Sequence, residues 1–494
     1  MALLRVGEGV KGRKSLVMLT ALTAGLAACT TVGPNFVPPE PPAVSAYAMP
    51  GDATPLAATL DPKTRVAGPW WRAFGSDHLN ALMDQALAGN LSVAAALAKL
   101  DAARAAQTVE GADRLPRVDA KAGAERERFN TAAFGFASFP SPTINLFNLG
   151  QTVSYDLDLF GGQRRRSEAA AARFEAEGRR ADGAYMILTA RVAAQAAQIA
   201  GLEARLAVDQ DILADDQKLI DIQNAAIAVG GTPASSNINR RQQLAEDQAL
   251  AEPVRQQIAQ ARHALALLVG QPPAAWTAPD FALSEFATPT SAPQEIPSAW
   301  IRHRPDVAAA EADLHAATAR IGVATADLYP SFRLSAGFSQ LATTPANLFG
   351  YSASAWNFGA GASAPVFHGG ALRAGKRAAE AEARLAMAQY QQTVLTALTQ
   401  AADVMTNLAH DEARLKDLNA AEASAKSNLA HEQSAYDLGG DPLIAVAEAK
   451  RRLDVTKVGR TTAEGARLAD LIELYAVSAT DWRDPVAAKL AAPQ

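Results

Sequence analysis

The residue with the most distinctive chemistry is Cys29, the only cysteine in a chain of 494 residues. It follows Leu26-Ala27-Ala28, and small residues before a cysteine are typical of a bacterial lipobox, where the thiol receives a diacylglycerol. A basic start and an apolar run over 16–28 precede it, which is the pattern of a secretory signal. The sequence predicts a signal peptide over 1–28 and lipidation at Cys29, with Thr30 favouring sorting to the outer membrane. An unmodified buried thiol beside an ordinary cleavage site is the alternative.

A second candidate for chemistry is the run from Gly370 to Lys376, GALRAGK, which resembles a phosphate-binding loop. Arg377 stands where such a loop needs the Ser or Thr that ligates Mg²⁺. The seven histidines show no metal-ligand spacing, and no nucleophile motif is found. We therefore expect no enzyme activity and no cofactor. The 46 basic and 51 acidic residues nearly balance, so no nucleic-acid partner is expected either.

Four segments alternate apolar and polar residues, as membrane-crossing strands do with one face to lipid and the other to a lumen. They are 117–128, 151–160, 331–340 and 355–366. An ordinary half-buried sheet has the same pattern, so both interpretations stay open. If the strands do cross a membrane, four cannot close a barrel, and hydrocarbon tolerates no open edge. Several copies of the chain must then share one barrel, although the strand count does not fix how many.

Long helices are the other main feature, and the pattern from Arg164 to Val229 is broken only by single glycines. At about 1.5 Å per residue this helix is roughly 100 Å long. Apolar residues recur every seven positions, which indicates left-handed packing against neighbouring helices. Polar residues such as Asp216 and Gln223 share the seam, which favours helices around a wet lumen over a dry rod. The heptad residues are Val192, Ile199, Leu206, Leu213, Ile220 and Ile227.

The chain is an internal duplication. Residues 101–123 resemble 315–337, so that Pro116 and Gly123 correspond to Pro330 and Gly337. Leu159-Phe160 corresponds to Val366-Phe367, and the turn at 229–233 corresponds to 438–442. Each half runs helix, proline break, two strands, very long helix, Gly-Gly turn and returning helix. A proline-rich segment from Pro34 to Pro55 reads as an extended, poorly packed tether.

These elements make the chain resemble the outer membrane factor family, the TolC-like and OprM-like channels of efflux pumps, in its lipoprotein branch. The resemblance covers most of the mature chain. Its motifs are Trp70-Trp71-Arg72-Ala73-Phe74-Gly75, Tyr155-Asp156-Leu157-Asp158-Leu159-Phe160-Gly161, Arg304-Pro305-Asp306-Val307, Tyr329-Pro330-Ser331 and Pro365-Val366-Phe367-His368-Gly369-Gly370.

The resemblance implies an α+β membrane protein: a homotrimer with a twelve-stranded β-barrel, four strands per chain, continuous with a long α-helical periplasmic barrel. The expected divisions are the signal peptide (1–28), a lipid-anchored extended segment (29–75), a first repeat (76–271), an equatorial insertion (272–300), a second repeat (301–480) and a C-terminal tail (481–494). The expected partners are a periplasmic adaptor protein and an inner-membrane RND transporter, with the acyl anchor in outer-membrane lipid.

The resemblance also assigns roles to two groups of residues. The Gly-Gly turns would be the tips that dock the adaptor, namely Val229, Gly230, Gly231, Thr232, Leu438, Gly439 and Gly440. Ile444, Glu448 and Arg451 share one helix face and would form the closed periplasmic gate, although the family usually has Asp where Glu448 stands. The equivalent first-half positions, Ser235, Asn239 and Gln242, are uncharged, so only the second half is expected to supply the gate.

Three functions follow as hypotheses. The first is the outer-membrane exit duct of a tripartite pump for small amphipathic solutes. The second is the same channel serving a type I protein secretion system. The third is a helical periplasmic lipoprotein that forms no channel. Lipidation favours the first, and the sequence does not identify the exported substrate.

Overall fold

The computed structural model describes residues 31–40, 42, 49, 51, 68–128, 130–135, 138, 140–231, 233, 235–289 and 301–478. The chain forms two compact units, and each is assembled from three stretches of sequence. Unit 1 comprises Met1–Pro39, Leu100–Glu177 and Ala310–Tyr390, and unit 2 comprises Glu40–Lys99, Gly178–Ala309 and Gln391–Gln494. Both repeats contribute to both units.

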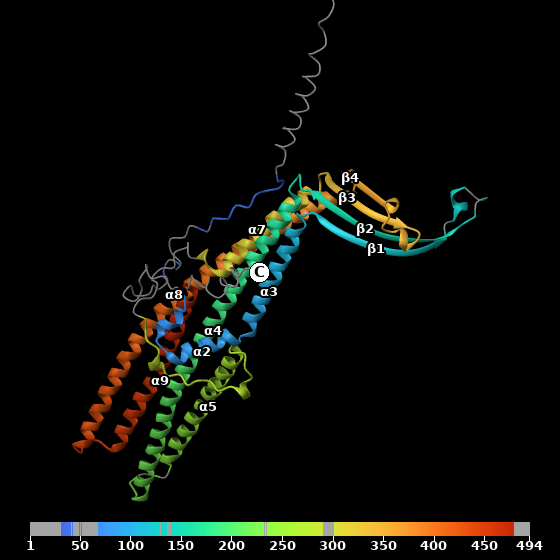
Figure 1. Ribbon diagram of the computed structural model, residues 1–494. Helices are drawn as coiled ribbons and strands as arrows, with labels where there is room; N and C mark the ends of the chain where they lie inside the picture. The colour runs from blue at the N-terminus through green and yellow to red at the C-terminus, as the bar shows by residue number, and fades with distance from the viewer. Residues whose placement is uncertain are drawn as a thin grey trace, which may run out of the picture. The chain divides into compact units, whose positions relative to one another are not determined.

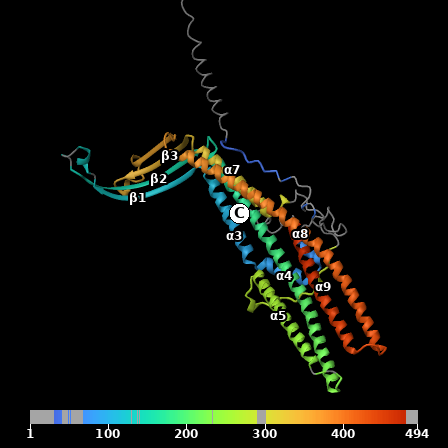
Figure 2. The same cartoon turned by 180° about the vertical axis from the view of Figure 1, so that it is seen from behind.

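Unit 1 contains a four-stranded antiparallel sheet that extends from one end of its helices (Figures 1 and 2). Its strands lie in chain order: β1 (Arg117–Arg128), β2 (Thr143–Leu157), β3 (Ser331–Ala342) and β4 (Ser354–Ser363). Because neighbouring strands are paired in sequence order, β1 and β4 are the two edges, and each has a strand on one side only.

The pairing places apolar residues opposite one another on one face. Val118 lies opposite Val153, which lies opposite Ala336, which in turn lies opposite Phe358. Side chains on this face are exposed in the single chain, with Val118 at 66% and Phe358 at 73%. The polar residues lie on the other face. The sheet therefore has one apolar and one polar face, as the alternation of residues in the sequence predicts.

Five strand ends differ from the sequence-based ranges. The second strand runs from 143 to 157 rather than 151 to 160, the third ends at 342 rather than 340, and the fourth runs from 354 to 363 rather than 355 to 366. Pro365 explains the early end of the fourth strand, since a proline has no N–H to donate to a neighbouring strand.

The duplication is visible in the sheet as two equivalent hairpins. Asn148 of β2 lies opposite Gly123 of β1, and Asn357 of β4 lies opposite Gly337 of β3. In both pairs the asparagine side chain fills the space above the glycine, where a Cβ would meet it at 2.8 and 2.3 Å. Each residue of β2 therefore corresponds to the residue of β4 that lies 209 positions later in the sequence. The two long helices, which begin at Gly162 and Ala371, are also 209 positions apart.

This spacing corrects the match of Phe160 with Phe367. At 209 positions from Phe160 lies Gly369, because the strands before the turn and the helices after it keep the same spacing in the two repeats. The environments differ accordingly. Phe160 stacks on Tyr329 with ring centroids 4.6 Å apart, whereas Phe367 is 87% exposed.

Helices make up most of the remaining described chain. The two longest are α4 (Gly162–Ala228) and α8 (Ala371–Asp437), with 67 residues each. The others are α2 (Asp77–Gly89), α3 (Leu91–Ala112), α5 (Ser236–Leu268), α7 (Pro305–Ala326) and α9 (Leu443–Ser478). Short 3-10 turns occur at Trp70–Phe74, Thr131–Phe134, Pro273–Ala275, Leu283–Glu285, Pro345–Asn347 and Tyr351–Ala353.

Unit 2 packs around the heptad seam and one aromatic cluster. Val192 and Ile199 on α4 and Leu408 on α8 are fully buried, as the seven-residue repeat predicts. Phe74 meets Tyr475 of α9 edge-to-face at 5.4 Å. The core thus ties the Trp-rich turn at 70–74 to the end of the last helix.

Two helices of unit 2 approach closely at glycines. A Cβ built on Gly201 of α4 would lie 3.2 Å from the Cα of Gly465 of α9, and the reverse distance is the same. This distance is shorter than most Cβ contacts, so a side chain at either position would require the two helices to move apart slightly.

Part of the proline-rich tether is packed, contrary to the sequence-based expectation. Residues 31–36 contact α4 and α7 of unit 1 through hydrogen bonds and one ring stack.

Candidate functional site

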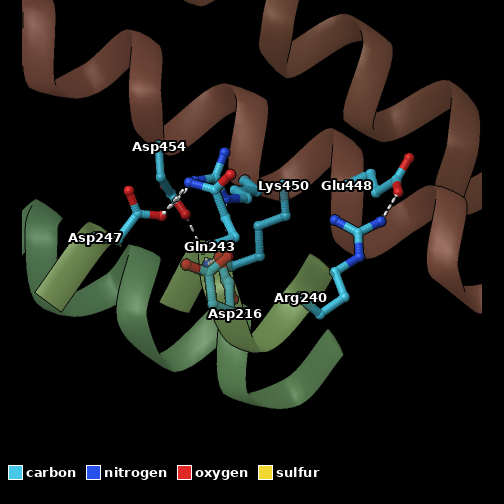
Figure 3. Close-up of polar contacts among 9 residues, drawn as sticks. Asp216, Arg240, Gln243, Asp247, Glu448, Lys450 and Asp454 are labelled. Atoms are coloured by element: carbon cyan, nitrogen blue, oxygen red, sulfur yellow. Dashed lines mark hydrogen bonds and ion pairs between the residues drawn. The ribbon is translucent and has the colours of Figure 1, made fainter. Parts of the chain in front are cut away.

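The proposed gate residues begin α9, and two of them are held by ion pairs within unit 2 (Figure 3). Ile444, Glu448 and Arg451 are half-buried. The carboxylate of Glu448 accepts a hydrogen bond from Arg240 of α5. The helix that begins after the second Gly-Gly turn is therefore tied to the returning helix of the first repeat.

Arg451 binds two carboxylates of the first repeat. Its Nε donates to Asp216 Oδ1 of α4 at 2.8 Å, and its Nη2 donates to Asp247 of α5. Gln243 Nε2 also donates to Asp247 Oδ2 at 3.2 Å. The Asp216 side chain is only 4% exposed and that of Arg451 is 21% exposed, so little water screens this pair.

The two acids share a proton-dependent contact. Burial and then the hydrogen bond with Asp247 raise the pKa of Asp216, and although Arg451 opposes both effects, the net pKa is about 6. For Asp247, burial also opposes ionisation, but hydrogen bonds from Asp216 and Arg451 hold its pKa below the ordinary value. The cluster is thus most strongly bound when Asp247 is ionised.

A second set of contacts lies one residue away and was missed by sequence reasoning. Lys450 Nζ lies 2.5 Å from Asp215 Oδ2 and 2.9 Å from Asp454 Oδ2, and Lys457 Nζ lies 2.6 Å from Asp454 Oδ1. Asp454 is fully buried. Although burial opposes its ionisation, the hydrogen bonds from Lys457 and Lys450 keep the pKa of Asp454 below its ordinary value.

A signal for this arrangement does exist in the sequence. The adjacent acids Asp215 and Asp216 face the adjacent bases Lys450 and Arg451. In a duplicated chain, opposite doublets on corresponding helical hairpins indicate that the two hairpins pair. We call Asp215, Asp216, Arg240, Asp247, Glu448, Lys450, Arg451 and Asp454 the interhairpin cluster.

Two sequence-based interpretations change with this geometry. Asp216 and Gln223 were assigned to a wet lumen, but they are 3% and 8% exposed within the single chain. Asp216 instead serves an ion pair between helices. The first repeat also supplies charged partners, since Arg240 lies beside the uncharged Asn239 and contacts Glu448.

The Gly-Gly turns have the geometry that their sequence predicts. Gly230 and Gly439 have φ of 75° and 77°, the left-handed conformation that favours glycine. The next residue in each turn, Gly231 or Gly440, donates its N–H to a carbonyl five residues back, which closes the helix end. Val229 and Leu438 are 84% and 88% exposed, so each turn presents an apolar side chain. Thr232 lies outside the described residues.

The other candidate sites add no reaction chemistry. Cys29 lies outside the described residues. Gly370 precedes α8, and the rest of the loop-like run to Lys376 forms its first turns. Among the residues that the structure describes, no group of three or more His, Cys, Asp or Glu could hold a metal ion. The interhairpin cluster holds α9 to α4 and α5 by charge.

Among the described helices, none is long and apolar enough to cross a membrane singly, although the bent pair α2 and α3 passes a test of length and composition together.

Comparison with known proteins gives consistent relatives over nearly the whole chain. The family model described as "Outer membrane efflux protein" matches residues 82–271 and 296–480. The outer membrane protein OprJ of Pseudomonas aeruginosa is 30% identical over 483 residues, covering 94% of this chain and 95% of that protein. The probable outer membrane lipoprotein SilC of Salmonella typhimurium is 25% identical, covering 92% and 96%. Among solved structures, the outer-membrane channel OprN superposes with a TM-score of 0.80 at 27% identity, covering 92% of this chain and 100% of that one.

Proposed function

This chain belongs to the outer membrane efflux protein family, and from that premise we propose that three copies of it form the exit duct of a tripartite pump. The chain lies in the outer membrane and serves transport rather than catalysis. The single observation that carries a barrel shared between copies is the four-stranded sheet with two unpaired edges, and the number three is the one expected for the family.

The edges matter because a strand edge in hydrocarbon leaves N–H and C=O groups without partners, each costing several kcal/mol. β1 of one copy can supply the partners that β4 of another lacks. Repeated three times, this contact closes a twelve-stranded barrel. The apolar row through Val118 and Phe358 would then face lipid, and the polar rows would face the lumen.

The duplication indicates the register of this contact. The β4–β1 contact between copies should repeat the β2–β3 contact within one copy, where Ser154 lies opposite Ser335. Ser363 of β4 is the counterpart of Ser154 of β2, because it lies 209 positions later. Lys121 of β1 is the counterpart of Ser335 of β3, because these two residues are 214 positions apart, as are Gly123 and Gly337. We therefore expect Ser363 of one copy to lie opposite Lys121 of the next.

Cysteine cross-linking tests both the trimer and the register. Because Cys29 is the only native cysteine, the double variant Ser363→Cys, Lys121→Cys should give a covalent trimer on non-reducing gels. The matched control pairs Ser363→Cys with Asp119→Cys, two residues or about 7 Å away along the strand, and should cross-link weakly. Preferential linkage through position 119 would refute the register alone. A parent protein that is monomeric in mild detergent would refute the trimer.

The partners proposed for this duct are a periplasmic adaptor and an inner-membrane RND transporter, with small amphipathic solutes as cargo. The exposed apolar tips, Val229 and Leu438, support adaptor docking because apolar side chains at 84% and 88% exposure are suited to a protein contact. A photo-reactive amino acid at either position should cross-link the adaptor in cells. Exclusive capture of the partner of a protein-secretion ATPase would instead favour type I secretion.

The gate is proposed to be the start of α9, with Ile444, Glu448 and Arg451 closing the duct while the interhairpin cluster is intact. The anchor is proposed to be an acyl group on Cys29. Ion conductance in planar bilayers tests the gate, since the closed parent should conduct poorly and variants that break the cluster should conduct more. A protein that never conducts, with or without the cluster, would favour a scaffold without a channel.

A further inference from the structure

A cavity of about 750 Å³ lies within unit 1, where the sheet meets the long helices. Its walls come from the adjoining ends of β2, β3 and β4, the turn after β2, the start of α4 and the end of α7. Sites for small organic ligands are clefts of about 300–1,000 Å³ with a few well-placed polar groups. The size of this cavity therefore suits a small solute. We call it the junction cavity.

Two guanidinium groups line the junction cavity, and both are partly open to solvent. Arg333 of β3 donates from Nε to Asp156 Oδ1 at 2.6 Å and from Nη2 to Asp156 Oδ2 at 3.0 Å, yet its side chain is 67% exposed. Arg166 Nη2 lies 3.5 Å from Asp327 Oδ1, longer than a strong hydrogen bond, and its side chain is 44% exposed. A guanidinium has more N–H donors than these contacts use, so both groups can bind a further anion.

The carboxylates of the junction cavity are more fully engaged than its guanidinium groups. Both oxygens of Asp156 accept hydrogen bonds from Arg333. Asp158 Oδ1 accepts from the Gln163 N–H at 3.0 Å, and its Oδ2 accepts from the Arg164 N–H at 2.9 Å, so Asp158 serves the start of α4. The hydrogen-bonding capacity that remains on charged groups is therefore mostly that of donors. This favours a ligand with an anionic group.

Aromatic and apolar side chains form another part of the wall. The Tyr329 ring stacks on Phe160 with centroids 4.6 Å apart and planes 22° apart, and Tyr329 remains 43% exposed. Both residues line the cavity together with Leu157 and Pro365. Aromatic rings pack well against such surfaces by offset stacking or edge to face. The wall is therefore suited to the apolar part of a ligand.

We propose that the junction cavity binds small aromatic anions such as aromatic carboxylates, with the anionic group on Arg333 and Arg166 and the ring against Tyr329. Arg333 and Asp156 lie opposite one another on the polar face of the sheet, which faces the lumen of the proposed barrel. In this respect the inference rests on the proposed function, because the bound anion is then a solute that the duct carries.

A neighbouring copy would add a third cation to this site. Ser363 of β4 lines the junction cavity and lies on the same polar face as Arg333. In the register proposed above, Lys121 of the next copy lies opposite Ser363, with its side chain on that face as well. The site is then complete only between two copies.

Binding of naphthoate to the full-length protein in nanodiscs of phosphatidylcholine tests the site. Ligand-detected saturation-transfer NMR gives the Kd, with empty nanodiscs as the baseline for partition into lipid. Arg333→Gln should weaken binding about tenfold, the lower value for a hydrogen bond to a charged group. The matched control is Arg377→Gln, which removes the same charge from an exposed position of α8 away from the cavity wall and should bind like the parent.

A variant of the opposite kind distinguishes a binding site from a structural ion pair. Asp156→Asn removes the carboxylate that competes for Arg333, so it should tighten naphthoate binding, and misfolding cannot produce such a gain. A structural role alone would make Asp156→Asn and Arg333→Gln both bind more weakly. Weaker binding in Asp156→Asn, or an unchanged Kd in Arg333→Gln, would overturn the site.

Ligands with the same ring test the role of charge and of the neighbouring copy. The cation naphthylmethylammonium should bind the parent more weakly than naphthoate, and equal affinity would overturn the recognition of an anion. Lys121→Gln should also weaken naphthoate binding, and an unchanged Kd would overturn the contribution of the next copy.

Two measurements separate this inference from its rivals. Displacement of naphthoate by a small fraction of phosphatidylglycerol in the nanodisc would assign the cavity to a lipid headgroup and overturn the solute site. Naphthoate binding in a protein that never conducts would refute the duct and keep the site. A conducting channel that binds no naphthoate would refute the site and keep the duct.

Discussion

Replacing Arg451 with alanine removes the cation that binds both Asp216 and Asp247. Removing one partner of a buried ion pair costs about 3–5 kcal/mol. The Arg451 side chain is 21% exposed, and exposed pairs contribute less than about 1 kcal/mol, so we expect about 2 kcal/mol per chain. If the cluster exists only in the closed state, the closed-to-open ratio falls about 30-fold for each chain, since 1.4 kcal/mol is tenfold.

The assay is single-channel recording in planar bilayers. Open probability of Arg451→Ala should rise strongly above that of the parent. The matched control is Arg452→Ala, which removes the same charge from the neighbouring, exposed position on α9 and should resemble the parent. Equal open probabilities for Arg451→Ala and Arg452→Ala would refute a role for the cluster in closure.

Three further predictions concern stability and lipidation. Burial, followed by a hydrogen bond with Asp411, raises the pKa of Asp470 to about 7. The folded state therefore holds this proton more tightly than the unfolded chain, so the melting temperature should rise when the pH is lowered from 8 to 5. The variant Asp470→Asn should lose this rise in melting temperature. Gly201→Leu should destabilise the fold by about 2 kcal/mol through overpacking against Gly465, and an unchanged melting temperature would show that the close crossing is absent. Cys29→Ser should abolish incorporation of labelled palmitate, and persistent labelling would place the acyl group elsewhere.

Much of the fold could be predicted from periodicity. The period of two gave the strands, and the first one, Arg117–Arg128, has the same bounds in the structure. The unbroken helical pattern and its heptads gave α4 with its buried Val192 and Ile199. These patterns are local, and backbone geometry alone relates them to the element that forms.

The contacts between distant segments were harder to predict. The pairing of Arg451 with Asp216 depends on which helices become neighbours, and nothing local encodes that. The packed segment 31–36 was also missed, since the prolines at 34 and 38 are typical of unpacked tethers. Its partner Arg165 lies within a run of three arginines, and only the fold distinguishes the buried one from its half-buried and exposed neighbours.

The duplication leads to a last prediction, because the two hairpins correspond in sequence spacing but differ in charge at the positions of the interhairpin cluster. The positions in the second repeat that correspond to Asp216 and Asp247 are Ala425 and Thr456, and Gln242 corresponds to Arg451. In a trimer of duplicated chains, the contact from one copy to the next should therefore lack the ion pairs found within each copy. Ion pairs would hold the two hairpins of each copy together, whereas no such ion pairs would hold the hairpins of neighbouring copies together. The closed state would therefore be lost at the contacts between copies.

Transplanting the charges tests this asymmetry. The triple variant Gln242→Arg, Ala425→Asp, Thr456→Asp would rebuild the cluster between copies, at positions that are exposed or half-buried in the single chain. Ion pairs at such positions contribute less than about 1 kcal/mol each, so open probability should fall below that of the parent. Gln242→Arg alone is the control, since it adds the cation without its acids and should leave closure unchanged. A triple variant that conducts like this control would mean that the contacts between copies do not repeat those within a copy.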